Sequence, residues 1–313
     1  MPSVAPDLSE RFRREIERLT DNQGRIGLAV SGGADSLALL LMAQATMPAW
    51  ISVATVDHGL RPEAAAEAEF VARICATLGI AHTILRPPAP ITGSLQAAAR
   101  TARYALLAQW ADDQELAWIA TAHHIEDQAE TLMMRLLRGS GSEGLSGIRG
   151  RNGKIIRPLL GWHRADLRAI VDAAAIIPVD DPTNDDPHYD RVRLRRMFAD
   201  NPWLNAAALA TSANILAETN RALDWSAERE AERRISHDRA GVSIDPTYLP
   251  TDLLRRLTLI ALRRIDPTIT PRGGQLTALI DALGQHKKTT IGDIVCQGGQ
   301  IWHMAAAPPR RTA

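Results

Sequence analysis

Residues 28–36 read Leu-Ala-Val-Ser-Gly-Gly-Ala-Asp-Ser, and this stretch decides the fold class of the chain. A short apolar run, Arg25 to Val30, leads into the two glycines, and an apolar segment extends beyond them to Met47. The pattern predicts a buried strand, a tight turn and a helix. Glycines in such a turn let backbone N–H groups approach phosphate oxygens, and the helix N-terminus adds a partial positive charge. The stretch therefore predicts an anion site, although a glycine turn with a Ser or Asp helix cap has the same local sequence.

Residues 31–36, called the phosphate loop below, differ from the common nucleotide motifs. They lack the Gly-Lys-Ser/Thr ending of a Walker A loop, and they do not match the GxGxxG pattern of dinucleotide sites. Asp35 is unusual in an anion site because a carboxylate repels phosphate unless a cation lies between them. We therefore expect Mg²⁺ at this position, with Asp35 as its ligand.

Strand-like and helical segments alternate from residue 25 to residue 137. Strands are expected at 25–30, 50–56, 82–85 and 116–120, and helices at 35–47, 63–78, 94–112 and 125–137. Continuous apolar strands that alternate with helices predict a parallel sheet covered on both faces. The expected fold is therefore α/β, with a doubly wound parallel sheet.

The last third of the chain has a different pattern. Residues 203–237 are rich in alanine and predict a long helix without strand signals, and further helices are expected at 253–264 and 275–283. Only short strand-like runs follow, at 291–295 and 300–304. Because 313 residues exceed one average domain, we expect a catalytic domain at residues 1–210 and a smaller, mainly helical C-terminal domain at residues 211–313.

Charge is balanced over the whole chain, with 36 basic and 36 acidic side chains, but it is segregated locally. Residues 149–168 hold six basic side chains against one acid, and residues 191–196 hold four arginines. Such local basic runs are compatible with nucleic-acid binding even though the net charge is zero.

Several classes of protein are disfavoured by what the sequence contains. The two cysteines, Cys75 and Cys296, form neither a disulfide framework nor a CxxC pair. The longest apolar run, residues 37–43, is far too short to span a membrane, and residues 1–10 do not read as a secretory signal. We therefore expect a cytoplasmic protein that makes no contact with a membrane.

A second group of polar residues follows the strand expected at 116–120. Residues 121–131 read Thr-Ala-His-His-Ile-Glu-Asp-Gln-Ala-Glu-Thr, with His123 just ahead of a helix and with Asp127 and Glu130 on its polar face. Ligands in open α/β sheets lie at the carboxyl ends of the strands, so these side chains are expected near the phosphate loop. A solvated acidic face near a helix N-terminus would have the same pattern.

A third element lies in the helix expected at 94–112. Arg100 and Arg103 share one helix face because they are three residues apart. Either guanidinium could neutralise phosphate charge. Taken alone, such a pair is equally typical of a solvated helix surface.

In this order the motifs resemble the tRNA(Ile)-lysidine synthetase family, which belongs to the PP-loop N-type ATP pyrophosphatases. The resemblance covers about residues 25–200. Two positions depart from the family pattern, Val192 in place of Asn and Glu126 where Asp is common. The motifs that carry it are Ser31–Ser36, Val56-Asp-His-Gly-Leu-Arg61, Ala99-Arg-Thr-Ala-Arg-Tyr104, Thr121–Thr131, Arg138-Gly-Ser-Gly-Ser-Glu-Gly-Leu145, Arg157-Pro-Leu-Leu160, Asp181-Pro-Thr-Asn184 and Tyr189-Asp-Arg-Val-Arg-Leu-Arg195.

The resemblance implies a reaction in two steps. The C2 oxygen of the wobble cytidine in tRNA(Ile) with a CAU anticodon attacks the α-phosphate of ATP and releases pyrophosphate. The ε-amine of free L-lysine then displaces AMP and leaves lysidine. The resemblance also implies that the C-terminal domain contacts the tRNA, and a homodimer is left open.

The same resemblance implies roles for the residues that match the family motifs. Those implied for ATP binding are Ser31, Gly32, Gly33, Ala34, Asp35, Ser36 and His58, with Asp35 also holding Mg²⁺. Those implied for catalysis are Asp35, Arg103, His123 and Asp127. Glu130 would bind the lysine ammonium, and Arg191, Arg193 and Arg195 would bind the tRNA backbone.

Three other functions fit parts of the sequence less completely. A tRNA thiolase on the same fold needs cysteines for a persulfide or an iron–sulfur cluster, and Cys75 and Cys296 are isolated. An amide-forming ligase for a small molecule would not need the arginine run or a second domain. An inactive nucleotide- or RNA-binding module would be expected to have a broken phosphate loop or to lack Asp127.

Overall fold

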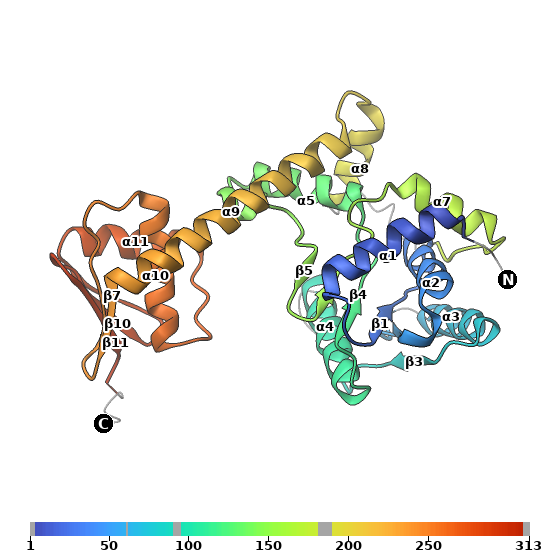
Figure 1. Ribbon diagram of the computed structural model, residues 1–313, viewed down its shortest axis with the longest axis horizontal. Coiled ribbons are helices and arrows are strands. Elements are labelled where there is room, and N and C mark those ends of the chain that lie inside the picture. The colour runs from blue at the N-terminus through green and yellow to red at the C-terminus, as the bar shows by residue number, and fades with distance from the viewer. Residues whose placement is uncertain (1–3, 61, 90–94, 181–189, 309–313) are drawn as a thin grey trace. The chain divides into compact units, whose positions relative to one another are not determined.

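The computed structural model describes residues 4–60, 62–89, 95–180 and 190–308. The motif Asp181–Asn184 and the motif residues Arg61 and Tyr189 lie outside these ranges. The chain divides into two compact units, Met1–Ala217 and Glu218–Ala313, whose elements are labelled in Figure 1. The boundary expected near residue 210 falls inside one continuous helix, α9 (Ala206–Arg234).

A six-stranded sheet forms the centre of the first unit. Its order is β3 (His82–Leu85), β2 (Ile51–Val56), β1 (Ile26–Ala29), β4 (Trp118–Ala120), β6 (Ile155–Ile156) and β5 (Arg151–Asn152). All neighbours pair in parallel except β5 and β6, which form an antiparallel hairpin. The prediction of an α/β fold with a mainly parallel sheet is confirmed. The hairpin was not expected, because two-residue strands give no periodic signal.

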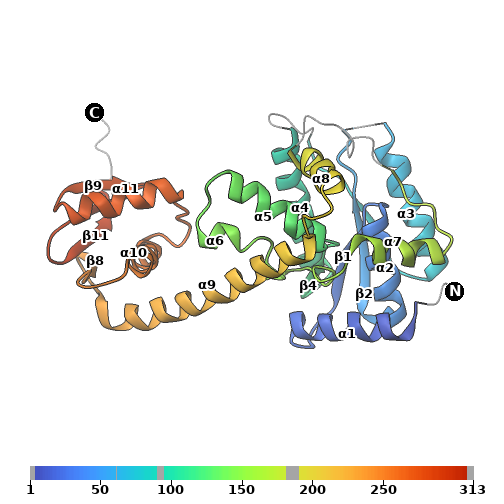
Figure 2. The same ribbon diagram turned by 90° about the horizontal axis from the view of Figure 1, so that it is seen from above.

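Helices cover both faces of this sheet. The helices described in this unit are α1 (Pro6–Thr20), α2 (Ala34–Thr46), α3 (Ala64–Leu78), α4 (Leu95–Asp113), α5 (Ile125–Leu137), α6 (Ser142–Leu145), α7 (Arg164–Ala173) and α8 (Asp190–Asp200), with a 3₁₀ turn at Pro48–Trp50. Leu28 of β1 lies in a core with α1, α2, α3 and α7. The next residue, Ala29, lies in a second core with α4. Figure 2 shows α2 and α7 packed side by side.

Gly27 of β1 lies where the structure has no space for a side chain. A Cβ atom at this position would lie 2.4 Å from the ring of Trp110 in α4. The ring is buried between the helix and the sheet. The glycine therefore allows α4, which carries Arg103, to pack closely on the strand that leads into the phosphate loop.

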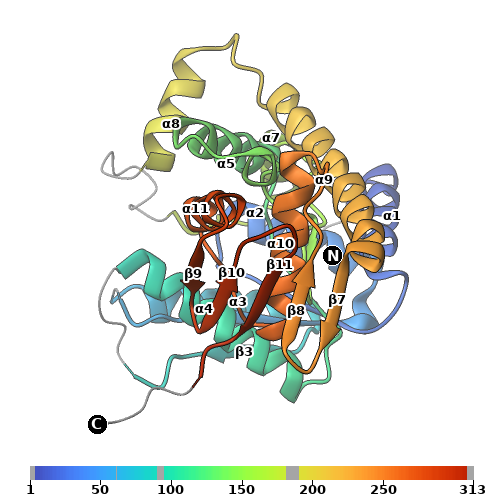
Figure 3. The ribbon, with the colours of Figure 1, turned by 90° about the vertical axis from the view of Figure 1, so that its left-hand side faces the viewer.

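The second unit corrects the sequence prediction. Its core is a five-stranded antiparallel sheet in the order β7 (Ile235–Asp238), β8 (Gly241–Ile244), β11 (Trp302–Ala306), β10 (Ile294–Gln297) and β9 (Lys288–Ile291). Figure 3 shows these strands side by side, and α10 (Thr251–Ile265) and α11 (Gly273–Gly284) pack against them. The expectation of a mainly helical domain is wrong.

The sequence did not predict this sheet because its strands are short. Most have four residues, and β8 alternates buried Val242 and Ile244 with less buried neighbours over a single hairpin arm. So short a period-two pattern is hard to separate from a loop or from the end of a helix. β7 also lies partly within the run, ending at His237, that we expected to be helical. No helix of the described residues is long and apolar enough to cross a bilayer.

Candidate active site

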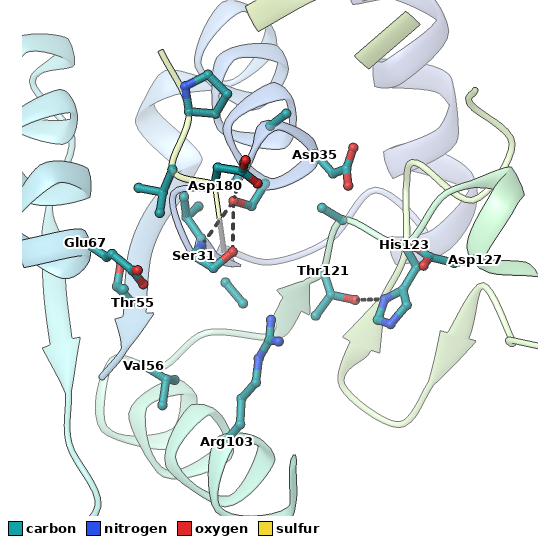
Figure 4. Close-up of a pocket in the computed structure, with 18 of the residues that line it drawn as sticks. Ser31, Asp35, Thr55, Val56, Glu67, Arg103, Thr121, His123, Asp127 and Asp180 are labelled. Carbon is teal, nitrogen blue, oxygen red and sulfur yellow. Dashed lines mark hydrogen bonds between the residues drawn. The ribbon is translucent and has the colours of Figure 1, made fainter. Parts of the chain in front are cut away.

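A cavity of about 1280 Å³ opens at the carboxyl ends of β1, β2 and β4. β1 pairs with β2 on one side and with β4 on the other, so the chain direction of successive connections reverses here. Ligands in open α/β sheets bind at such a switch point. Figure 4 shows Ser31, Asp35, Arg103, Thr121, His123 and Asp127 around this cavity.

The phosphate loop has the backbone that its glycines require. Gly32 has a φ of +89°, which disfavours side chains other than hydrogen. Gly33 caps α2 without a side-chain hydrogen bond, so the first N–H groups of the helix have no cap and can bind an anion. Ser31, Gly33, Ala34 and Asp35 all line the cavity.

Ser36 supports the shape of this loop. Its hydroxyl donates to the Gly33 carbonyl at 2.9 Å and accepts from the Ser31 N–H at 3.1 Å. It therefore fixes the turn from inside, while Ser31 remains exposed at the cavity.

Arg103 and His58 line the opposite side of the cavity. The guanidinium of Arg103 extends from α4 toward the phosphate loop (Figure 4), and among the described residues none forms a hydrogen bond or ion pair with it. His58 follows β2, and its Nδ1 atom is buried without a hydrogen-bond partner in the described structure. Burial and the charge of Arg103 lower the pKa of His58, so its imidazole is neutral at pH 7. The cavity thus presents a free cation and a neutral donor or acceptor.

His123 and Asp127 lie next to each other at the end of β4. Thr121 Oγ1 and His123 Nδ1 share a hydrogen bond of 2.9 Å. Burial and the nearby arginine charges lower the pKa of His123 to about 4, which leaves the ring neutral. Burial alone would raise the pKa of Asp127, but the charges of His124 and Arg191 outweigh it and lower that pKa. A proton acceptor and a carboxylate therefore share this wall.

His124 was not singled out from the sequence, yet it connects the carboxylates of the site. Its ring is buried, with Nε2 at 3.4 Å from Asp35 Oδ2 and 3.5 Å from Asp127 Oδ2. Its Nδ1 donates to Glu126 Oε2 at 2.9 Å. Burial alone would lower the pKa of His124, but the contacts with Asp35 and Glu126 outweigh it and raise that pKa to about 10. His124 is therefore a buried imidazolium that balances three carboxylates.

We expect His124→Ala to destabilise the protein, because it leaves buried carboxylates without their cation. Removing one partner from a buried ionic network costs about 3–5 kcal/mol. At about 2–4 °C per kcal/mol, the melting temperature should fall by more than about 6 °C in a thermal scan. His237→Ala, a change of an exposed histidine in β7, is the matched control. Equal melting temperatures for the two variants would contradict a stabilising role for His124.

Glu126, which the sequence marked only as a departure from the family pattern, joins α5 to the start of α7. Its oxygens accept hydrogen bonds from His124 Nδ1, from His163 Nδ1 at 3.0 Å and from the Arg164 backbone N–H at 3.0 Å. Burial opposes ionisation, but these hydrogen bonds lower the pKa of Glu126 to about 2. The bonds place the first turn of α7, and with it the Arg164 side chain, beside Asp35.

A second cavity, of about 330 Å³, lies beside the first. Its polar lining consists of Glu126, Glu130, Arg164 and Arg195, and its apolar lining comes from residues 198–206. Glu130 is 2% exposed, and its Oε2 atom has no hydrogen-bond partner in the described structure. Burial raises the pKa of Glu130, although the charge of Arg195 opposes this. The cavity therefore combines an unsatisfied carboxylate oxygen with an apolar wall.

The three arginines assigned to tRNA lie on two faces of α8, with Arg191 and Arg195 on one and Arg193 on the other. Arg191 and Arg195, four residues apart, line the large cavity. Arg195 Nε donates to Glu130 Oε1 at 2.8 Å. Arg193 is exposed and forms an ion pair with Asp190.

Three arginines that line the cavity, Arg164, Arg168 and Arg196, were not assigned to the site from the sequence. Arg164 and Arg168 of α7 line its edge, and Arg164 NH2 lies 3.9 Å from Asp35 Oδ2. The only signal was their place in the basic segment 149–168. Residues 139–145, part of a motif that carries the family resemblance, line neither of these cavities.

Comparison with known proteins agrees with this geometry. Residues 8–201 match the model of the PP-loop domain family. The chain is 44% identical to the tRNA(Ile)-lysidine synthase of Zymomonas mobilis, over 93% of this chain and 91% of that protein. It is 42% identical to the enzyme of the same name from Novosphingobium aromaticivorans, over 97% of this chain and 95% of that one.

Among solved structures, the U34-tRNA thiolase NcsA of Methanococcus maripaludis, described with its [4Fe-4S] cluster, matches with a TM-score of 0.55. The alignment covers 68% of this chain and 78% of that one, at 14% identity, which shows a shared fold and nothing finer. The family model and the two close relatives go further, and together they show that the chain belongs to the PP-loop family as a tRNA(Ile)-lysidine synthase.

Proposed function

We propose that this chain adenylates the C2 oxygen of the wobble cytidine in a CAU-anticodon tRNA(Ile) and then joins lysine to that carbon. The observation that carries the proposal is the single cavity in which the phosphate loop, Arg103, His123 and Asp127 meet. The chain is thus an ATP-dependent ligase that forms a carbon–nitrogen bond and releases AMP and pyrophosphate.

In the first step, the phosphate loop would hold the β- and γ-phosphates at the N-terminus of α2. The cytidine oxygen attacks the α-phosphorus, and the bond to the bridging oxygen of pyrophosphate breaks. Negative charge develops on the phosphate oxygens, and the guanidinium of Arg103, which has no ion-pair partner among the described residues, would stabilise it. His58, neutral and partly buried, would contact the nucleotide from the end of β2.

Asp35 fits the role of a magnesium ligand. Its Oδ1 atom is buried and has no hydrogen-bond partner in the described structure. Within the same residues, no group of three or more His, Cys, Asp or Glu side chains could hold a metal by itself. This fits Mg²⁺, which is often bound by one or two carboxylates together with substrate phosphates. The ion would neutralise phosphate charge in the cavity.

In the second step, a lysine amine must bind as an ammonium and then lose a proton, since its reference pKa is about 10.4. We propose that the smaller cavity takes the lysine, with Glu130 Oε2 facing the ammonium. Asp127 lies one helical turn before Glu130 and lines the large cavity. Asp127 or the neutral ring of His123 would accept the proton as the amine approaches the adenylated base. The amine then attacks the adenylated carbon, and AMP leaves.

Sulfur transfer, the chemistry of the thiolase relatives of this fold, does not suit the cysteines of this chain. Cys75 and Cys296 are both buried. Burial raises the pKa of the Cys75 thiol to about 12 and that of Cys296 to about 11. A reactive cysteine needs a lowered pKa and access to its substrate.

The direct test is mass spectrometry of a CAU-anticodon tRNA(Ile) after incubation with the protein, ATP and lysine. The expected product is a cytidine that has gained lysine with loss of water, formed only when ATP is present. A tRNA of unchanged mass would refute the proposed reaction. The homodimer stays a prediction, which light scattering of the purified protein checks.

We also propose that Arg193 contacts the tRNA backbone, since it is the one of the three assigned arginines that is exposed and directed away from the carboxylates of the site. Arg193→Ala should weaken binding of all tRNAs alike and reduce the slope of log Kd against log salt by about one. Filter binding across a salt series measures this. Arg18→Ala, in α1 and exposed, is the control. An unchanged slope for Arg193→Ala would contradict the contact.

A further inference from the structure

The two cavities share one wall. This wall contains two arginines, of which one is already bonded to a carboxylate and the other has only a long ion-pair contact. Arg164, Arg195 and Ala199 line both cavities. Arg195 is engaged, because its Nε donates to the buried carboxylate of Glu130 at 2.8 Å. For Arg164, the nearest ion-pair partner that the described residues offer is Asp35 at 3.9 Å, and the side chain is 47% exposed. Arg164 is therefore the cation free to bind an anion at this wall.

The position of Arg164 is fixed although its guanidinium is not strongly paired. It is the first residue of α7, and its backbone N–H donates to Glu126 Oε2 at 3.0 Å. The other oxygen of Glu126 accepts from His163, and Oε2 also accepts from His124. Both oxygens of Glu126 thus have partners, whereas Glu130 Oε2 is a buried carboxylate oxygen without one in the described structure, which makes it the better acceptor for an ammonium in the smaller cavity.

Besides its ε-ammonium, free lysine carries an α-ammonium and an α-carboxylate, and the cavity must accommodate the carboxylate in particular. Its α-carboxylate would lie among Glu126, Glu130 and the phosphates of ATP, all of which repel it. A guanidinium binds a carboxylate with two parallel hydrogen bonds and can offset that repulsion. The smaller cavity is lined by Glu130 of α5, which can accept an ammonium, and by Arg164 of α7, which can bind a carboxylate.

We propose that Arg164 binds the α-carboxylate of lysine and thereby selects a free amino acid over a simple diamine. This rests on the proposed function and assigns a specificity residue within the same site. Glu130 then binds the ε-ammonium of lysine, and Arg164 binds its α-carboxylate.

The test compares L-lysine with cadaverine, which has the same chain and ammonium but no carboxylate. Lysine-dependent modification of tRNA gives the half-saturating lysine concentration, and cadaverine is measured as a competitor of lysine. Arg164→Gln should raise the half-saturating lysine concentration about 10- to 100-fold, the loss expected for a charge-assisted hydrogen bond to carboxylate. The inhibition constant of cadaverine should change less than about twofold, because cadaverine makes no contact that the variant removes.

Two further variants sharpen the result. Arg164→Lys keeps the charge but not the paired geometry, so its lysine requirement should lie between those of the wild type and Arg164→Gln. Arg168→Gln, one turn along the same helix and outside the smaller cavity, should leave the ratio of the lysine and cadaverine constants unchanged.

Three results would overturn the proposal. An unchanged lysine requirement in Arg164→Gln would show that Arg164 does not bind the carboxylate. Equal shifts for lysine and cadaverine, or loss of pyrophosphate release without lysine, would place Arg164 in the ATP step. A wild-type protein that forms no lysine adduct at all would instead refute the proposed function itself.

Discussion

Asp35→Ala should reduce ATP-dependent pyrophosphate release by about a thousandfold or more, which is the largest effect we expect from one substitution. The change removes the buried Oδ1 atom that has no partner in the described structure and that we assign to Mg²⁺. Without a cation between them, the phosphates of ATP and the remaining carboxylates of the cavity repel one another. Pyrophosphate release in the presence of tRNA, measured across a Mg²⁺ titration, gives the effect.

The fold should survive this change, because His124 keeps its contacts with Glu126 and Asp127. Asp166→Ala removes an exposed carboxylate of α7 that does not line the cavity, and it should release pyrophosphate at the wild-type rate. A folded Asp35→Ala protein with near-normal turnover would remove the magnesium role, and with it our account of the phosphate loop.

Glu130→Gln should raise the half-saturating lysine concentration about 10- to 100-fold, while pyrophosphate release without lysine stays within about threefold of the wild type. The amide keeps the size of the side chain but removes the charge that attracts an ammonium. Because Glu130 lines only the smaller cavity, the ATP step has no direct contact with it. Parallel assays of pyrophosphate and of modified tRNA separate the two steps.

Glu143→Gln, an exposed carboxylate on α6, is the matched control and should change neither assay. If Glu130→Gln lost pyrophosphate release and lysine use to the same extent, Glu130 would serve the ATP step.

The hydrogen bond between Arg195 and Glu130 leads to a related prediction for Arg195. Arg195→Gln should also raise the lysine requirement if the pair holds the carboxylate in place.

The sequence predicted the parts of the site that follow from chain order. His123 and Asp127 were expected near the phosphate loop, because the carboxyl ends of parallel strands meet at one sheet edge. The family resemblance implied a catalytic role for Arg103, which lies on a helix. All three residues line the cavity. What the sequence could not give was contact across elements. The role of His124 depends on Asp35 approaching from α2 and Glu126 from α5.

The arginine run and the strands of the second unit both depend on contacts between distant elements, which the local sequence does not determine. Residues 191–195 alternate charged and apolar side chains, but they form a helix in which Arg191 and Arg195 share one face and Arg193 points elsewhere. Only the packing of α8 against α5 decides which arginine meets the carboxylates. In the second unit, strands of four residues become recognisable only when they pair with strands far along the chain, as β8 does with β11.

Arg164, Arg195 and Ala199 line both cavities, so a ligand in the smaller cavity lies beside the nucleotide and not in its place. If lysine occupies the smaller cavity, as we propose, we expect the two small substrates to occupy the enzyme together rather than in exchange. Saturating lysine should then leave the apparent affinity for ATP unchanged. A nucleophile that is already bound when the base is adenylated would also shorten the lifetime of an intermediate that water could otherwise hydrolyse.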